Sequence, residues 1–278
     1  MLNENLEVET VSEEGNSGIF DIKGLYRGYG LTLGTALRRV LLSSLPGAAI
    51  TQVKIKGVGH EFTTIDDVLE DVVEITLNLK KVRFEILSEE LGYNEPVLVT
   101  LKKKGEGKVT AKDIDAKGSI RVTNPDQHIA TITSKTTELE IELMVERGLG
   151  YVPSEEFKGG ALPVGTIQLD ALFSPVKKAN FVVENMRVGR DTNFNKLRLS
   201  IETDGGITPS EALKESFIIL NNHLARAITQ FGGDPMDTSE DPLKALVDKK
   251  AEERAKEEEG EVENIEAVKE KKKAKKAK

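Results

Sequence analysis

Four acidic residues, Asp66, Asp67, Glu70 and Asp71, form a dense group of possible metal ligands. Clustered carboxylates could hold the two metal ions of a phosphoryl-transfer site, but no acidic triplet on a loop of that kind is visible. The acids instead precede a segment with helical apolar spacing, where the helix dipole favours negative charge. We therefore expect no metal site and no cofactor.

The histidines and the absence of nucleophiles lead to the same expectation. His60, His128 and His223 share no metal-ligand spacing, and His60, beside Glu61, is interpreted as a solvent-facing loop residue. The chain has no cysteine, which excludes disulfides, cysteine zinc sites and iron–sulfur clusters. It also lacks a Gly-Lys-Ser/Thr phosphate loop and a serine nucleophile elbow. The sequence therefore predicts that this chain has no active site of its own.

A glycine cluster is the remaining candidate for ligand chemistry. Gly28-x-Gly30-x-x-x-Gly34 is one residue out of register with a dinucleotide loop, whose third glycine would fall at Leu33. No strongly apolar strand precedes it, and no acidic residue stands out about 20 positions later. Nucleotide binding through this loop stays as an alternative, and an amphipathic helix is the favoured interpretation.

That helix is predicted to begin with Thr32 as its cap and to run to about Ser44, before Pro46 and Gly47. Its buried stripe consists of apolar residues at helical spacing: Leu33, Leu37, Val40 and Leu41. Its opposite face presents polar residues and one leucine: Thr35, Arg38, Arg39 and Leu42. Arginines beside a leucine suit a protein–protein contact.

Two further helices are predicted. One begins within residues 63–67 and has a four-residue apolar stripe: Val68, Val72, Ile75 and Leu79. The other begins at a capping box of Thr208, Pro209 and Glu211 and stops at Gly232-Gly233. Its apolar residues recur about every 3.5 positions, as in a coiled-coil seam: Leu213, Phe217, Leu220, Leu224, Ala227 and Phe231. The seam packs either within one subunit or between two.

Elsewhere the apolar period is two, which is typical of strands. Residues 19–23 and 50–58 are predicted strands, and Leu6, Val8 and Val11 suit another short one. Residues 82–176 form a β-rich module punctuated by turn residues, and residues 180–188 and 196–203 add two strands. The sequence thus predicts an α+β fold with a β-rich module between helical segments.

The bulk composition limits the function classes. The chain has 278 residues, enough for one or two domains, with no run of 18 apolar residues and no apolar leader. We therefore expect a soluble, cytoplasmic protein without a membrane partner. Its net charge of −8 argues against a body that wraps DNA. Residues 241–278 are rich in charge of both signs and poor in apolar residues, which predicts a disordered or lone-helix tail.

Four long strings of residues carry a specific resemblance. They are YRGYGLTLGTALRRVLLSSLPGAAITQVKIKGVGHEFTTIDDVLEDVVEITLNLKKV at residues 26–82, ERGLGYVP at 146–153, LDALFSPV at 169–176 and KLRLSIETDGGITPSEAL at 196–213. Taken in order, they closely resemble the alpha subunits of bacterial RNA polymerase, over about residues 20–231.

The resemblance implies an assembly scaffold. Residues 1–46 with 176–235 would form a discontinuous, helix-based dimerisation subdomain, residues 47–175 an inserted β-rich subdomain that binds the large subunits, and residues 236–278 a charged tail. The homodimer would receive the catalytic beta and beta-prime subunits, with omega and sigma in the same assembly. Such an assembly works in the bacterial cytoplasm, at the nucleoid during transcription. The chain would be a non-catalytic subunit of a nucleotidyltransferase.

The resemblance also implies two groups of contact residues. Those for docking beta and beta-prime are Arg39, Leu42, His60, Lys80, Leu169, Asp170 and Ser174. Those for the dimer interface, which the apolar stripes also favour, are Leu33, Leu37, Leu41, Leu213, Phe217, Leu220, Leu224 and Phe231.

The C-terminal part departs from the family pattern. The family usually continues into a small helical domain that binds promoter DNA, but nothing after Asp241 has the apolar periodicity for one. The lysine-rich residues 269–278 could contact phosphates weakly and without sequence preference. A free-standing, non-specific DNA-binding module acting through these lysines is a second alternative, which the negative charge of the rest of the chain disfavours.

Overall fold

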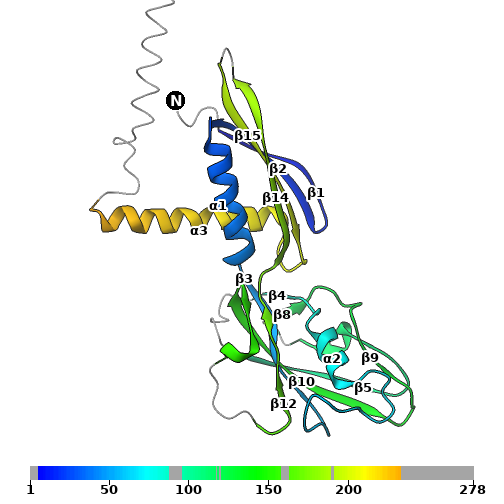
Figure 1. Ribbon diagram of the computed structural model, residues 1–278. Coiled ribbons are helices and arrows are strands. Elements are labelled where there is room, and N and C mark those ends of the chain that lie inside the picture. The colour runs from blue at the N-terminus through cyan, green and yellow to red at the C-terminus, as the bar shows by residue number, and fades with distance from the viewer. Residues whose placement is uncertain are drawn as a thin grey trace, which may run out of the picture.

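A computed structural model describes residues 6–87, 96–116, 118, 120–157, 163–188 and 191–232. Within these residues the fold is α+β, as predicted, with three α-helices and antiparallel strand pairs. The elements gather into two bodies, each around its own apolar core, and the chain passes between them beside β3 (Pro46–Ile55) (Figure 1).

The first body packs two helices against a four-stranded sheet. Its strands, in spatial order, are β1 (Glu7–Glu14), β2 (Ser17–Tyr26), β15 (Asp191–Thr203) and β14 (Val176–Val188). Helix α1 (Tyr29–Ser43) lies on β14 and β15 and crosses α3 (Pro209–Gln230) (Figure 1). Leu37 and Leu41 of α1 are fully buried against Leu197 and Leu199 of β15. Complete burial of one leucine contributes roughly 1.5–3 kcal/mol.

Helix α1 begins earlier than its sequence predicts. Gly28 is the N-cap, with a left-handed φ of 91°, so the chain can turn into the helix there at little steric cost. Thr32, the predicted cap, lies inside the first turn and donates its hydroxyl to the Gly28 carbonyl at 3.4 Å. The prediction of the Thr32 cap was therefore wrong.

The glycines within α1 serve packing. A Cβ on Gly30 would lie 2.7 Å from Val183, and a Cβ on Gly34 would lie 2.6 Å from Phe181. The helix can therefore approach β14 closely only because these positions lack a side chain. In addition, the Gly28 amide donates to Asn195 Oδ1 at 2.8 Å. The glycines contact the sheet, which speaks against a phosphate-binding role.

The second body is a larger sheet with one helix. The strands of this sheet, in spatial order, are β7 (Ile114–Asp115), β5 (Val97–Lys104), β10 (Glu138–Leu149), β3, β4 (Phe84–Ile86) and β8 (Ile120–Val122). Strand β12 (Thr166–Gln168) also pairs with β3. Two small sheets pair β6 (Gly107–Thr110) with β9 (His128–Ile132) and β11 (Tyr151–Val152) with β13 (Ala171–Leu172). The 3₁₀ turns η1 (Ala111–Asp113) and η2 (Ser154–Glu156) complete it.

Helix α2 (Val72–Leu79) begins later than predicted, with Asp71 as its N-cap. The preceding residues pair with β9 instead: the Leu69 amide donates to Thr131 O at 3.0 Å. Glu70, which the sequence places among helix-start acids, is buried and accepts hydrogen bonds from Thr131 and His128. The residues before Asp71 therefore pair with a distant strand, although their apolar spacing is helical. From Val72 onward the predicted apolar stripe of the helix is buried.

Helix α3 begins as its sequence predicts, with the reciprocal Thr208–Glu211 capping box and Pro209 in the first turn. It ends at Gln230, and Gly232 adopts a left-handed φ of 81°. Only its first half packs on the body. From residue 221 to residue 230 every side chain except Ala225 is exposed, so the second half of α3 projects beyond the body (Figure 1).

The passage between the two bodies is tightly packed. Arg83 of the second body forms an ion pair with Asp204 of the first at 3.7 Å, and both side chains are largely buried. Gly206 lies against the Phe84 carbonyl, where a Cβ would come within 2.9 Å. Gly47, which starts the crossing into β3, is tighter still: its Cβ would lie 1.9 Å from the carbonyl oxygen of Phe173.

We expect Gly47→Ala to destabilise the chain by roughly 1–3 kcal/mol, because backbone atoms must move to admit the methyl group. Gly59→Ala is the matched control, since nothing lies within 4 Å of its Cβ position. Urea unfolding of both variants measures the difference. Equal stability of the two would contradict the close packing at Gly47.

Candidate docking surface

The C-terminal end of α1 presents the first predicted docking residues. Arg39 and Leu42 are exposed there, and the Arg39 side chain makes no hydrogen bond or ion pair within the described part of the chain. Arg38 differs, because its Nε donates to Ala179 O at 3.1 Å and so holds α1 on β14. Of the two neighbouring arginines, Arg39 is the one available to a partner.

The second body continues this surface. Gly150, with a φ of 63°, links β10 to β11 and lies beside the end of α1, where its Cβ position is 3.4 Å from Ser43 O. The strand pair that follows places Tyr151 opposite Leu172, and both side chains are exposed, Tyr151 by 60%. The neighbouring Leu149 is exposed as well. An apolar patch therefore adjoins Arg39 and Leu42.

Sequence reasoning did not select Leu149, Tyr151 or Leu172 as contact residues. Leu149 and Tyr151 fall in the ERGLGYVP string and Leu172 in LDALFSPV, but the strings alone do not say which side chains face outward. Their exposure depends on the pairing of β11 with β13, which joins segments about 20 residues apart. Exposed tyrosines are enriched in protein contact sites, and the two leucines add apolar surface beside this one.

Lys80 and Asp170 lie next to this patch and bind each other. Lys80 Nζ donates to Asp170 Oδ2 at 2.8 Å, and the Ser154 amide donates to Asp170 Oδ1 at 2.9 Å. These two donors, Lys80 foremost, lower the pKa of Asp170 to about 2. Because Asp170 directly precedes β13, the pair fixes the strand that carries Leu172.

We expect a carbon-13 NMR titration to give Asp170 a pKa of about 2, and Lys80→Met to raise it toward the ordinary value of about 3.9. A lowered folded-state pKa stabilises the fold above about pH 4, and this contribution is lost as the pH falls toward 2. An unchanged Asp170 pKa in Lys80→Met would mean that the Ser154 amide alone holds the carboxylate.

Three of the predicted docking residues do not join this surface. Leu169 and Ser174 are buried; the Leu169 amide donates to Thr51 O at 2.8 Å and the Ser174 hydroxyl to Val176 O at 3.4 Å. Because they are buried, these two residues can only hold residues 170–173 in place and cannot themselves contact a partner. His60 is exposed, but it follows the far end of β3, a ten-residue strand of about 33 Å that starts beside α1.

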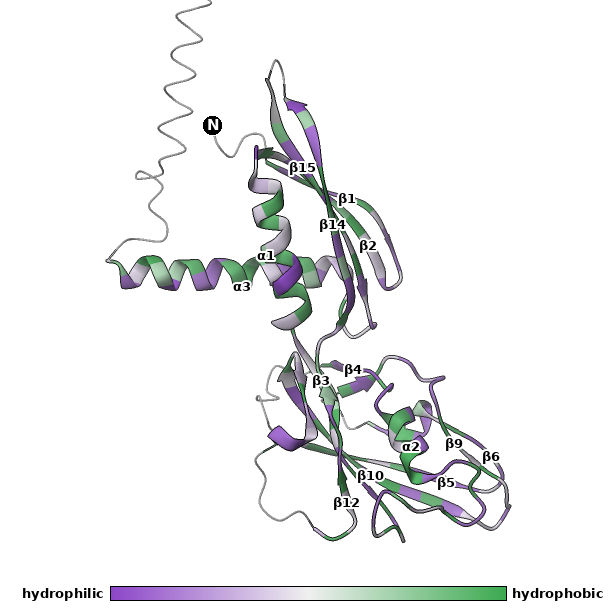
Figure 2. Ribbon diagram, in the orientation of Figure 1, coloured by the Kyte–Doolittle hydropathy of each residue, from purple (hydrophilic) through white to green (hydrophobic). Residues whose placement is uncertain are grey.

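A separate apolar surface lies on α3. Leu224 is 56% exposed and Phe231 94% exposed, and apolar residues continue along the projecting half of the helix (Figure 2). Leu33, Phe217 and Leu220 are half-buried against the body. By contrast, three residues predicted for the dimer interface are enclosed in the chain's own core: Leu37, Leu41 and Leu213. They have no side-chain surface left to offer, so the interface proposal no longer includes them.

The N-terminal turn of α1 adds exposed apolar residues that sequence reasoning missed. Tyr29 and Leu31 are 45% and 62% exposed. They precede the predicted Thr32 cap and so fell outside the predicted helix. The first body therefore exposes apolar side chains at the start of α1 as well as on α3.

The described residues contain no group of three His, Asp or Glu side chains placed to hold a metal ion. His128 donates to Glu70 at 2.7 Å, and His223 Nδ1 donates to Ile219 O at 2.8 Å within α3. No helix in the described ranges is long and apolar enough to cross a membrane.

Comparison with known proteins identifies a matching family and several relatives. Residues 53–174 match the family described as the RNA polymerase Rpb3/RpoA insert domain. DNA-directed RNA polymerase subunit alpha of Roseiflexus castenholzii is 48% identical over 225 residues, which are 81% of this chain and 65% of the relative. The same subunit of Oceanobacillus iheyensis is 47% identical over 79% of this chain and 68% of the relative. That of Alkaliphilus oremlandii is 46% identical over 81% and 69%.

The matched region thus spans about two thirds of the length of these relatives, and slightly less for the first. The chain belongs to the family of the alpha subunits of DNA-directed RNA polymerase, the enzyme of transcription.

Proposed function

We propose that this chain is the dimeric assembly scaffold of its RNA polymerase. The observation that carries the proposal is the projecting half of α3, where Leu224 and the C-cap residue Phe231 are 56% and 94% exposed within the described part of the chain. A second copy with the same exposed helix is a self-complementary partner, since a two-fold interface uses one patch twice. Burying several such side chains, at roughly 1.5–3 kcal/mol each, favours the dimer and offsets the cost of association.

The surface around Arg39 is proposed as the docking site of a large catalytic subunit, beta on one protomer and beta-prime on the other. Arg39 can form paired hydrogen bonds with a partner carboxylate. Leu42, Tyr151 and Leu172 supply an apolar centre beside it. Tyrosine and arginine are the residue types most enriched among binding hot spots. His60 would then belong to a separate contact at the far end of β3.

We assign a different function to each of the two bodies. We assign dimerisation to residues 1–46 with 176–235, and presentation of the large-subunit surface mainly to residues 47–175. The large subunits supply catalysis, omega and sigma join the same assembly, and the assembly works in the cytoplasm. Contact with DNA through residues 269–278 is a further proposal, and these lysines lie outside the described residues.

The alternative functions have less support. Nucleotide binding at Gly28, Gly30 and Gly34 would need an open glycine loop, but two of these glycines are packed against β14 and its neighbour. A free-standing DNA-binding module rests on the tail lysines alone. Saturable nucleotide binding by the purified chain would support the first alternative. DNA binding that is lost when residues 269–278 are deleted would support the second.

Light scattering of the purified chain, alone and with beta from the same source, tests the scaffold. One chain weighs 30.5 kDa, so a dimer should weigh about 61 kDa. Addition of beta should give a complex of two chains and one beta. A monomer that does not bind beta would overturn the proposal.

A further inference from the structure

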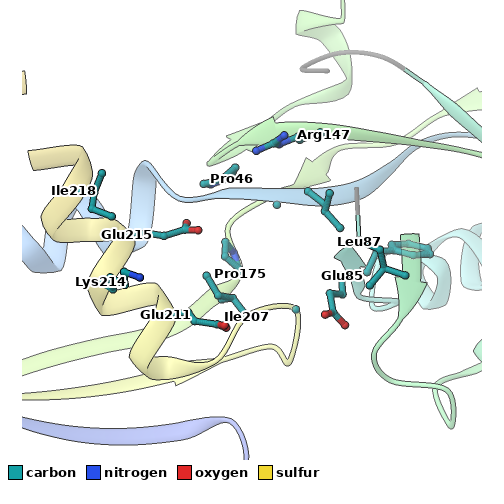
Figure 3. Close-up of a pocket in the computed structure, with 14 residues that line it drawn as sticks. Pro46, Glu85, Leu87, Arg147, Pro175, Ile207, Glu211, Lys214, Glu215 and Ile218 are labelled. Carbon is teal, nitrogen blue, oxygen red and sulfur yellow. The ribbon is translucent and has the colours of Figure 1, made fainter. Parts of the chain in front are cut away.

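A cavity lies between the two bodies, on the side where α3 faces the second body. It has a volume of about 560 Å³, and its walls come from α3, the crossing at Pro46 and Pro175, the Ile207 turn, and β4 and β10 (Figure 3). Small-molecule sites typically measure about 300–1,000 Å³ and are frequent at domain interfaces. The cavity is separate from the surface around Arg39 and from the projecting half of α3.

The lining is mixed, and its apolar part is firmly held. Pro46, Pro175, Ile207 and Ile218 face the space from three different segments. The turn before Ile207 cannot easily move, because the Gly206 amide donates to Asp204 Oδ1 at 2.9 Å and Asp204 is paired with Arg83. The site is therefore largely preformed, which reduces the entropy lost when a ligand binds.

The polar wall contains one carboxylate with open hydrogen-bonding capacity. Figure 3 shows Glu215 pointing from α3 into the cavity. No group in the described chain donates a hydrogen bond to Glu215, whereas Glu211, one turn earlier, already accepts from Thr208. Burial, and then the charge of Glu211, raise the pKa of Glu215; the charge of Arg147 opposes this less strongly. A cation at Glu215 would relieve this repulsion.

The basic groups nearby leave room for such a ligand. Arg147 lies in β10, near Pro46 at the crossing between the bodies (Figure 3). Lys214 is exposed, and its long stem lets its ammonium group stay in water. Glu85 is occupied by a hydrogen bond from Arg121 at 2.9 Å. Glu215 is thus the acceptor in the cavity that a ligand can reach.

We propose that this cavity binds an organic cation, a guanidinium, amidinium or ammonium group carried on an apolar body, with Glu215 as its anionic acceptor and Ile207 and Ile218 against the body. The chemistry is shared by a free small cation and by an arginine side chain of a partner protein. The proposal is independent of the docking and dimer surfaces.

The test is an NMR titration of the full chain with benzamidine, with uncharged benzamide as the matched probe. Benzamidine should bind saturably and shift the amides around Ile207 and Glu215, and benzamide should bind at least about tenfold more weakly, since it lacks the charge-assisted hydrogen bond. Glu215→Gln should weaken benzamidine binding by a similar factor. Glu156→Gln, an exposed change on η2, should not.

A second titration with N-acetyl-arginine amide separates the two sources. Tighter binding of this probe than of benzamidine assigns the cavity to an arginine side chain, and the reverse order assigns it to a free small cation. Equal binding of benzamidine and benzamide, shifts that map elsewhere, or insensitivity to Glu215→Gln would each overturn the proposal. Dimer mass and beta binding are separate readouts, so they would stand in any of these cases.

Discussion

Replacing Leu224 by glutamate should raise the dissociation constant of the homodimer at least about 100-fold. Leu224 is 56% exposed in one chain, so the change removes little packing within the subunit, and glutamate is a good helix former. In the proposed dimer the same position is apolar and covered. A carboxylate there would have to lose its hydration without a partner, in addition to the lost burial of leucine.

Analytical ultracentrifugation measures the effect, and circular dichroism shows whether α3 stays folded. Asn222→Glu is the matched control: it adds the same charge two residues earlier, on the opposite side of the helix, and Asn222 is also exposed. The control should remain a dimer. If Leu224→Glu dimerises as tightly as Asn222→Glu, the seam on α3 is not the interface.

Replacing Arg39 by alanine should weaken the binding of beta by about 2 kcal/mol or more, which is roughly 30-fold, and leave the dimer intact. Arg39 is exposed at the end of α1 and its side chain has no partner within the described residues, so removing the guanidinium should not disturb the fold. Its planar guanidinium can form two hydrogen bonds to one carboxylate, which lysine cannot reproduce. Arg39→Lys should therefore recover only part of the affinity.

Co-purification and a binding titration with beta measure the loss. Lys108→Ala is the control, because it removes an exposed positive charge from β6 in the second body. Wild-type amounts of beta on Arg39→Ala would refute the assignment. Loss of the dimer together with beta binding would show instead that Arg39 supports the fold or the dimer seam.

Local sequence signals determined several features of this chain. The capping box at Thr208 and Glu211 sets the start of α3, because its hydrogen bonds join residues three apart. Alternating apolar residues predicted β3 and the β-rich module of residues 82–176, since the side chains of a strand face opposite sides in turn. The long motifs were specific enough to indicate the family.

Only the tertiary structure decided which residues are available to a partner. Leu37, Leu41 and Leu213 have the same periodicity as Leu224, yet they are buried in the chain's own core, because the sheet and the crossing of α1 over α3 cover only part of each helix. Lys80 and Asp170, about 90 residues apart, bind each other.

The same holds for the new features of the surface. Tyr151 and Leu172 meet because β11 pairs with β13, and Glu215 faces a cavity because α3 and β10 line the same space. Two helices begin at other residues than their sequences predict. The N-cap of α1 is Gly28 instead of Thr32, and α2 begins only at Val72 because the preceding residues pair with β9. Periodicity reports which side of an element is apolar, and only long-range packing determines whether that side meets its own chain or another.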